Sequence, residues 1–183
     1  MSLLRRRRDE QAGHQDQDEI DVLANLDRVN AVYATGLMDA EPRPEIEALA
    51  RQAAEALHAP IGLMTLVDAD RQYFAGRFDA DAAADGSSAR ETPLDVSYCK
   101  YVVSRRAPLE ISDAQRDPLV RDNPATVMDG VRSYLGVPLR AEDGSVLGSF
   151  CVVDRKTRDW TAADRRQLEG FAHEAMELTG PQH

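Results

Sequence analysis

Cys99 and Cys151 are the residues of this sequence most suited to redox or metal chemistry. Two thiols that meet in a fold can form a disulfide or bind a soft metal ion. A zinc site normally has four ligands, and no histidine or further cysteine lies at ligand spacing from either thiol. Free cysteines are also often buried as small hydrophobic side chains. We therefore expect two buried, slowly reacting thiols and no bound metal, with a redox pair or a soft-metal site as the alternative.

A second polar group lies between residues 113 and 123, where Asp113, Asp117, Asp122 and Asn123 follow one another at short spacing. Their oxygen atoms could bind a cation or a polar ligand. The same side chains also accept hydrogen bonds from backbone N–H groups in turns and at helix N-termini, and an irregular segment needs many such bonds. We favour the structural role, and keep Asp113, Asp117 and Asn123 as candidate ligand-binding residues.

No constellation typical of an enzyme is visible in the sequence. None of the histidines neighbours a serine or cysteine in the pattern of a catalytic triad. Glycine-rich phosphate loops are absent from the sequence as well. The sequence therefore predicts no catalytic residues. The four histidines are His14, His58, His173 and His183.

The elements that must position these residues begin with an N-terminal region in two parts. Residues 1–17 are polar, charged and without hydrophobic period, which predicts a disordered tail. Residues 18–36 are predicted to form a helix whose apolar positions alternate at spacings of four and three, as in a short coiled coil. We expect this helix to offer a dimer contact. The apolar positions are Val22, Leu26, Val29 and Tyr33.

The remaining sequence alternates between helical and strand patterns. Helices are predicted after Pro44 and from Thr161, where Thr161 and Asp164 form a capping box. Apolar runs around 61–76 and 132–154 predict two hairpins. Between the hairpins we expect a long surface loop over 79–92, a helix to about residue 105, a strand over 108–112 and a short helix opened by Asn123-Pro124. The predicted fold is α+β: an antiparallel central sheet with the terminal helices on one face, and short helices and loops covering a pocket on the other.

Several segments resemble one family in their order and sequence. These are 37–42 (LMDAEP), 66–74 (LVDADRQYF), 93–99 (PLDVSYC), 111–118 (ISDAQRDP), 131–139 (VRSYLGVPL) and 144–154 (GSVLGSFCVVD). Together they resemble the GAF domain family in its bacterial signalling form, over a domain of residues 37–180. The resemblance implies a sensory module with a pocket between the sheet and the middle helices, dimeric through its terminal helices. From their types and predicted positions, the candidate pocket residues are Phe74, Tyr98, Cys99, Asp113, Asp117, Asn123, Tyr134 and Cys151.

The function that we expect from this resemblance is a noncatalytic sensory or regulatory domain that binds a small molecule or a partner protein. An unidentified signalling partner would supply the output. The alternatives are a thiol-dependent reductase of the free methionine sulfoxide type and a ligand-free scaffold for protein interactions. The sequence lacks the family's cyclic-nucleotide signature and a bilin-attachment cysteine with its adjacent histidine. No ligand or cofactor is therefore carried over.

Composition limits the partners further. The formal net charge is −10, from 32 acidic and 22 basic residues, whereas nucleic-acid binding needs a basic face. No window approaches the ~20 apolar residues of a membrane span, and the start lacks the apolar stretch of a secretory signal. We expect a cytoplasmic protein with reduced thiols that binds neither nucleic acid nor membranes.

Overall fold

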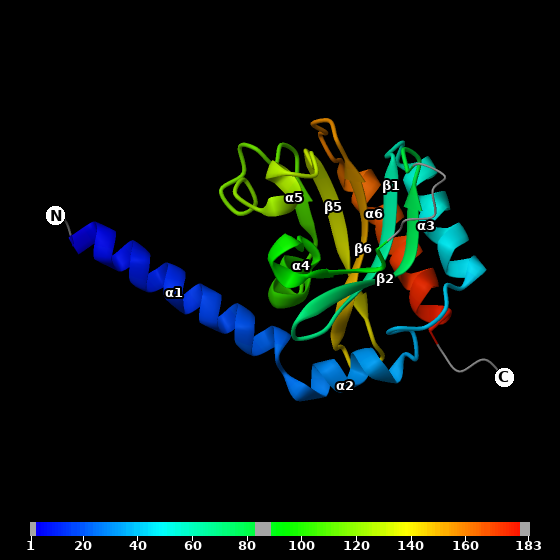
Figure 1. The fold of residues 1–183 in the computed structure, drawn as a ribbon, viewed down its shortest axis with the longest axis horizontal. Coiled ribbons are helices and arrows are strands. Elements are labelled where there is room, and N and C mark those ends of the chain that lie inside the picture. The colour runs from blue at the N-terminus through cyan, green and yellow to red at the C-terminus, as the bar shows by residue number, and fades with distance from the viewer. Residues whose placement is uncertain (1–2, 83–88, 180–183) are drawn as a thin grey trace.

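The structure is a computed structural model that describes residues 3–82 and 89–179. Its centre is an antiparallel sheet of six strands in the order β3-β2-β1-β6-β5-β4 (Figure 1). The two predicted hairpins form its core, with β1 and β6 paired at the middle. Every residue of β6 is buried, because this strand is covered on both faces. The strands are β1 (Ile61–Val67), β2 (Arg71–Asp79), β3 (Glu91–Pro93), β4 (Leu109–Ile111), β5 (Ser133–Arg140) and β6 (Val146–Asp154).

Two helices, α3 (Pro44–Ala56) and α6 (Ala162–Glu177), pack side by side on one face of the sheet (Figure 1). Their apolar stripes form one core with the strands, which includes Ile46, Phe150 and Leu168. Gly62 permits the close approach of α3, since a Cβ at this position would lie 2.1 Å from the carbonyl oxygen of Ala50. The predicted capping box is present at the start of α6.

The opposite face is covered by short elements: η1 (Leu94–Val96), α4 (Cys99–Arg105) and α5 (Pro124–Val127). A second apolar core lies beneath them and includes Val102, Ile111 and Tyr134. The predicted α+β fold, with a helical layer on one face and short elements on the other, is thereby confirmed. Of the predicted surface loop over 79–92, residues 83–88 lie outside the described residues, and β3 lies at its end.

The N-terminal region differs from its sequence prediction. Residues 3–23 form helix α1 (Leu3–Leu23) where a disordered tail over 1–17 was expected. The segment is free of proline and contains four Arg, three Gln and three Leu residues, which favour a helix even without an apolar stripe. Helix α1 also lies on the α4 side of the sheet (Figure 1), and Glu19 forms an ion pair with Lys100 of α4 at 3.7 Å. The first helix therefore does not join the layer of α3 and α6.

The single helix predicted over 18–36 is broken in two. Asn25 lies at the break and is the N-cap of the second helix, α2 (Leu26–Ala34). Its side chain accepts a hydrogen bond from the Arg28 N–H, which stabilises the start of this helix. The four apolar positions of the predicted seam are consequently divided between two helices. Leu26 is 75% exposed and Tyr33 is 48% exposed, whereas Val22 and Val29 are half-buried.

Arg28 holds this junction to the sheet. Its buried guanidinium donates hydrogen bonds to the carbonyl oxygens at the end of α1 and at the adjoining ends of β1 and β6. Burial lowers the pKa of Arg28 to about 10, so the group remains cationic at neutral pH. The acceptors and their distances are Val22 (3.2 Å), Leu23 (2.6 Å), Val67 (2.6 Å), Asp68 (3.2 Å) and Val146 (3.4 Å).

None of the helices in the described residues is long and apolar enough to cross a membrane.

Candidate functional site

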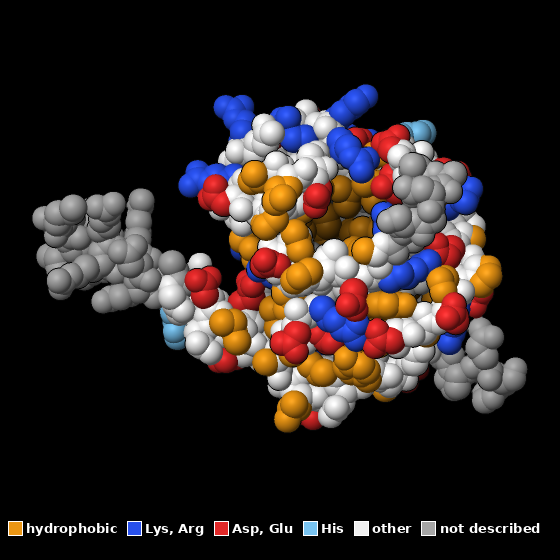
Figure 2. All heavy atoms as spheres, in the orientation of Figure 1, with side chains coloured by type: hydrophobic (Ala, Val, Ile, Leu, Met, Phe, Trp, Pro, Cys, Tyr) orange, Lys and Arg blue, Asp and Glu red, His pale blue; other side chains and the backbone are white. Residues whose placement is uncertain are grey.

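A cavity of about 570 Å³ lies between the sheet and the short elements of the α4 face. Figure 2 shows it as a hollow with apolar walls near the middle of the molecule. Its walls come from β1, β2, β5 and β6 on the sheet side, and from η1, α4 and the residues around α5 on the other side. A volume of this size fits a small organic molecule.

The register of the sheet decides which strand residues face the cavity. Cross-strand partners lie on the same face of an antiparallel pair, and Leu63 pairs with Cys151 as Ile61 pairs with Val153. All four line the cavity. The alternate residues of β6, including Phe150, belong to the core under α3 and α6. The structure thus places the face of β6 that carries Cys151 toward the cavity.

Five of the eight candidate residues line the cavity: Phe74, Tyr98, Cys99, Tyr134 and Cys151. They come from β2, α4 and its N-terminal flank, β5 and β6, and so meet only in the folded chain.

The three polar candidates from the irregular segment do not line the cavity. Asp113 accepts from the N–H of Gln115 and forms an ion pair with Arg132 at 3.2 Å. Asp117 accepts a hydrogen bond from the Leu119 N–H. Asn123 caps α5 through the Ala125 N–H. All three thus hold the backbone of their own segment, which is the role favoured from their residue types.

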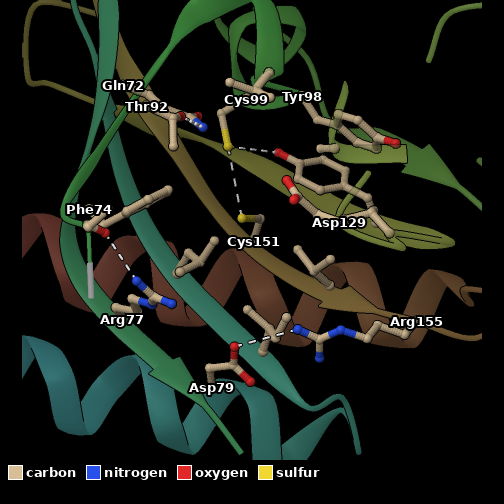
Figure 3. A pocket seen from close by; sticks show the side chains of 18 residues that line it. Gln72, Phe74, Arg77, Asp79, Thr92, Tyr98, Cys99, Asp129, Cys151 and Arg155 are labelled. Carbon is tan, nitrogen blue, oxygen red and sulfur yellow. Dashed lines mark hydrogen bonds and ion pairs between the residues drawn. The ribbon is translucent and has the colours of Figure 1, made fainter. Parts of the chain in front are cut away.

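Charged residues at the open side of the cavity were missed by the sequence analysis. Arg77 and Asp79 are partly exposed and Asp129 and Arg155 are exposed, whereas the cysteines are buried. Arg155 pairs with Asp79 at 3.7 Å, and Arg77 donates to the carbonyl oxygen of Ala89 at 3.0 Å (Figure 3). The polar mouth and apolar interior would hold an amphipathic molecule in one orientation.

Arg77 lies one residue beyond the predicted hairpin segment of 61–76, and a β-bulge turns it toward the cavity. Thr65 pairs with Phe74 and Met64 pairs with Gly76, so Ala75 is an extra residue in β2. Strict alternation would place Phe78 on the face of Phe74. The extra residue instead places Arg77 on that face, and no feature of the sequence marks the bulge.

The two thiols meet at the inner wall of the cavity. The sulfur atoms of Cys99 and Cys151 are 3.9 Å apart, and the side chains point toward each other (Figure 3). The Tyr134 hydroxyl donates to the Cys99 sulfur at 3.3 Å and lies 3.0 Å from the Ser149 hydroxyl. The buried Thr65 hydroxyl has no hydrogen bond of normal geometry. All other buried side-chain N and O atoms of the described residues have a hydrogen-bond partner.

These contacts give the two thiols different acidities. The pKa of Cys99 is lowered because the hydrogen bond from Cys151, together with those from nearby hydroxyl groups, outweighs the effect of burial. The pKa of Cys151 is raised well above its usual value, first because its thiol donates to Cys99 and then because it is buried. Burial also keeps the Tyr134 hydroxyl protonated by raising its pKa. Cys99 is therefore the sulfur of the pair that more readily becomes a thiolate.

Gly136 provides the space in which Tyr134 reaches the sulfur. Both residues lie on the cavity face of β5, and a Cβ at Gly136 would come within 2.2 Å of the Tyr134 hydroxyl oxygen. The ring of Tyr134 also meets that of Tyr98 edge-on, with centroids 5.4 Å apart. Tyr98 in turn hydrogen-bonds to Thr126. The position of the Tyr134 hydroxyl is thus fixed from several directions.

A polar network joins α4 to the sheet beside this group. Ser97 donates to the side-chain oxygen of Gln72 at 2.6 Å, and the Gln72 amide donates to Thr92 at 2.6 Å. The Ser97 hydroxyl also accepts from the Lys100 N–H at the start of α4. Across the described residues, no three side chains of His, Cys, Asp or Glu are grouped so that they could hold a metal ion.

Comparison with known proteins places this arrangement in a family. The pattern of the GAF domain matches residues 42–177. The chain belongs to the GAF domain family. It is 34% identical over 143 residues to a cyclic di-GMP phosphodiesterase of Pseudomonas aeruginosa, and the match covers 77% of this chain but 23% of that protein.

Solved structures share the GAF fold at low sequence identity. The GAF domain of a phosphoenolpyruvate-protein phosphotransferase from Acinetobacter superposes with a TM-score of 0.59 at 15% identity, over 84% of this chain and 91% of that one. The free methionine-R-sulfoxide reductase of Neisseria meningitidis, solved with its substrate, also gives 0.59 at 17% identity, over 80% and 83% of the two chains. These likenesses establish the fold, and membership in the GAF family supports a sensory or regulatory role.

Proposed function

We propose that this GAF domain is a noncatalytic sensor whose cavity binds a small organic molecule. The observation that carries the proposal is the cavity of about 570 Å³, which combines an apolar interior with charged residues at its open side. Ligand sites commonly have this composition, since apolar surface supplies binding energy and a few polar groups fix orientation. The ligand is a molecule whose apolar part packs against Phe74 and Tyr98, with its polar end near Arg77 and Asp129.

The signal leaves the cavity through α4. This helix contributes Cys99 to the inner wall, and its outer side contacts α1 through the ion pair between Lys100 and Glu19. A ligand that shifts α4 would therefore shift α1 or its contacts. We propose that a signalling partner reads this change and supplies the output. The phosphodiesterase activity of the Pseudomonas relative is not proposed for this chain, because the match covers 23% of that protein.

Ligand binding is tested by a thermal-shift screen of metabolites against the wild type and two variants. Ala125→Phe fills the cavity from α5, whereas Val127→Phe adds the same ring on the same helix at a side chain that is 69% exposed and outside the lining. A ligand at 100 times its Kd stabilises the folded state by about 2.7 kcal/mol. Compounds that stabilise the wild type and Val127→Phe, with no effect on Ala125→Phe, support the proposal. Equal stabilisation of all three proteins refutes it.

A thiol-dependent reductase is the second candidate, because two sulfur atoms lie 3.9 Å apart at the cavity wall. The reductases of Neisseria and Thermoplasma share the fold at 17% and 15% identity. Incubation with free methionine-R-sulfoxide and a dithiol reductant separates the two functions. A sensor produces no methionine above the background of the Cys99→Ser variant, whereas a reductase produces methionine over many turnovers.

A further inference from the structure

Cys99 and Cys151 have the geometry of a reactive dithiol. Their side chains come from α4 and β6, 52 positions apart in the sequence, and the sulfur atoms face each other at 3.9 Å. Both sulfurs belong to residues that line the cavity, although neither residue is exposed at the molecular surface. A small molecule in the cavity therefore lies next to Cys99, which keeps 4% of its surface exposed, whereas Cys151 keeps none.

The surroundings distinguish the two sulfur atoms. Tyr134 donates a hydrogen bond to Cys99, and the Ser149 hydroxyl stands behind Tyr134 at 3.0 Å. Thr65, whose hydroxyl lacks a normal partner, pairs with Ser149 across β1 and β6 on the same face. Hydroxyl groups that donate to sulfur stabilise a thiolate without adding a charge. The pKa of Cys99 is lowered accordingly.

We propose that this dithiol is an oxidation site for small hydroperoxides, in which Cys99 reacts first and Cys151 completes a disulfide between α4 and β6. The proposal goes beyond ligand sensing and does not depend on which molecule the cavity binds. It also reverses the expectation of two slowly reacting core cysteines, because that expectation assumed apolar surroundings for both thiols.

The chemistry needs no further reactant. The Cys99 thiolate attacks the terminal oxygen of the hydroperoxide, so that an S–O bond forms and the O–O bond breaks. The departing oxygen takes up a proton and leaves as an alcohol or, from hydrogen peroxide, as water. The Cys151 sulfur then attacks the Cys99 sulfenic acid, an S–S bond forms, the S–O bond breaks, and the hydroxyl leaves as water with the Cys151 proton. Two thiols and one hydroperoxide thus give one disulfide, with two electrons transferred to oxygen.

Tyr134 is a positioning residue in this scheme. Its hydroxyl holds the Cys99 sulfur opposite Cys151 and favours the thiolate. Tyr101 offers a matched control, because it lies two residues after Cys99 on α4 but does not line the cavity. The charged residues that line the cavity are Arg77, Asp79, Asp129 and Arg155. The other titratable groups of the cavity are Tyr98, Tyr134 and the two thiols themselves.

The test is a titration of the reduced full-length protein with hydrogen peroxide and with tert-butyl hydroperoxide. Thiols are counted by alkylation after denaturation, and products are identified by intact mass. We expect both thiols to disappear together at one equivalent, in a monomer two hydrogen atoms lighter. Cys151→Ser should stop at a sulfenic acid that dimedone traps, and Cys99→Ser should react at least tenfold more slowly than the wild type.

The position of Tyr134 is tested by the rate and its pH profile. Tyr134→Phe should slow thiol loss several-fold at neutral pH and move the pH of half-maximal rate upward, while Tyr101→Phe should leave both unchanged. Three results would overturn the proposal: no thiol loss at ten equivalents, equal rates for wild type and Cys99→Ser, or disulfides between chains in place of the internal one. A failed metabolite screen leaves these results unaffected, so the two proposals can fail separately.

Discussion

Replacement of Arg28 by methionine tests how the N-terminal helices are held to the sheet. Methionine replaces the aliphatic part of the buried side chain but removes every donor. The five carbonyl oxygens that accept from Arg28 would then lose these hydrogen bonds, two of which are only 2.6 Å long. A hydrogen bond to a charged group contributes about 1.5–3 kcal/mol, and water can solvate some of the freed carbonyls. We expect the free energy of unfolding to fall by about 3 kcal/mol.

The assay is urea unfolding followed by far-UV circular dichroism and by the fluorescence of Trp160, the single tryptophan. Arg71→Met is the matched control. Arg71 forms ion pairs with Asp39, Asp68 and Glu91, but its side chain remains 25% exposed, and its partners Asp39 and Glu91 are more than half exposed. Such pairs contribute about 1 kcal/mol or less. Equal, small losses for the two variants would refute the reasoning, because they would show that the buried carbonyls do not depend on Arg28.

Three further predictions concern the site and the N-terminal helices. Gly136→Ala should displace the Tyr134 hydroxyl and so change the rate at which the thiols are alkylated. A rate equal to that of the wild type would contradict the packing of Tyr134 against Gly136. Deletion of residues 1–17 should leave the melting temperature within about 2 °C of the wild type, because the described side chains of that stretch are exposed; a larger loss would mean that the start of α1 docks on the domain. The double variant Leu26→Asp and Val29→Asp should convert a dimer to a monomer in sedimentation experiments, and a wild-type monomer at tens of micromolar would disprove a dimer through these helices.

The sheet and its covering helices were accessible from the sequence because their signals are local. Alternating apolar residues, Asp143-Gly144 in a turn and the capping box at Thr161 each specify structure within a few residues. The same reasoning failed at the N-terminus, where a charged segment without a stripe forms α1. A periodic pattern of apolar residues indicates which side of a helix is buried. Helix α1 protrudes from the domain, so its sequence needs no such pattern.

The site was accessible only in part. Phe74, Tyr98, Tyr134 and the cysteines were identified by their sequence blocks and do line the cavity. Arg77 was missed because β2 extends beyond the predicted hairpin segment, and the bulge at Ala75 places it on the cavity face. The contact between Cys99 and Cys151 depends on how α4 sits over β6, and no local pattern encodes this distance.

The clearest test of ligand binding is native mass spectrometry of the protein purified from its own source, beside Ala125→Phe from the same source. The account predicts that the wild type retains a small molecule, seen as a mass difference that vanishes on denaturation. The filled cavity of Ala125→Phe should carry none. Two results would contradict the claim that this cavity is a ligand site: a wild-type mass equal to that of the polypeptide alone, or the same bound molecule in both proteins.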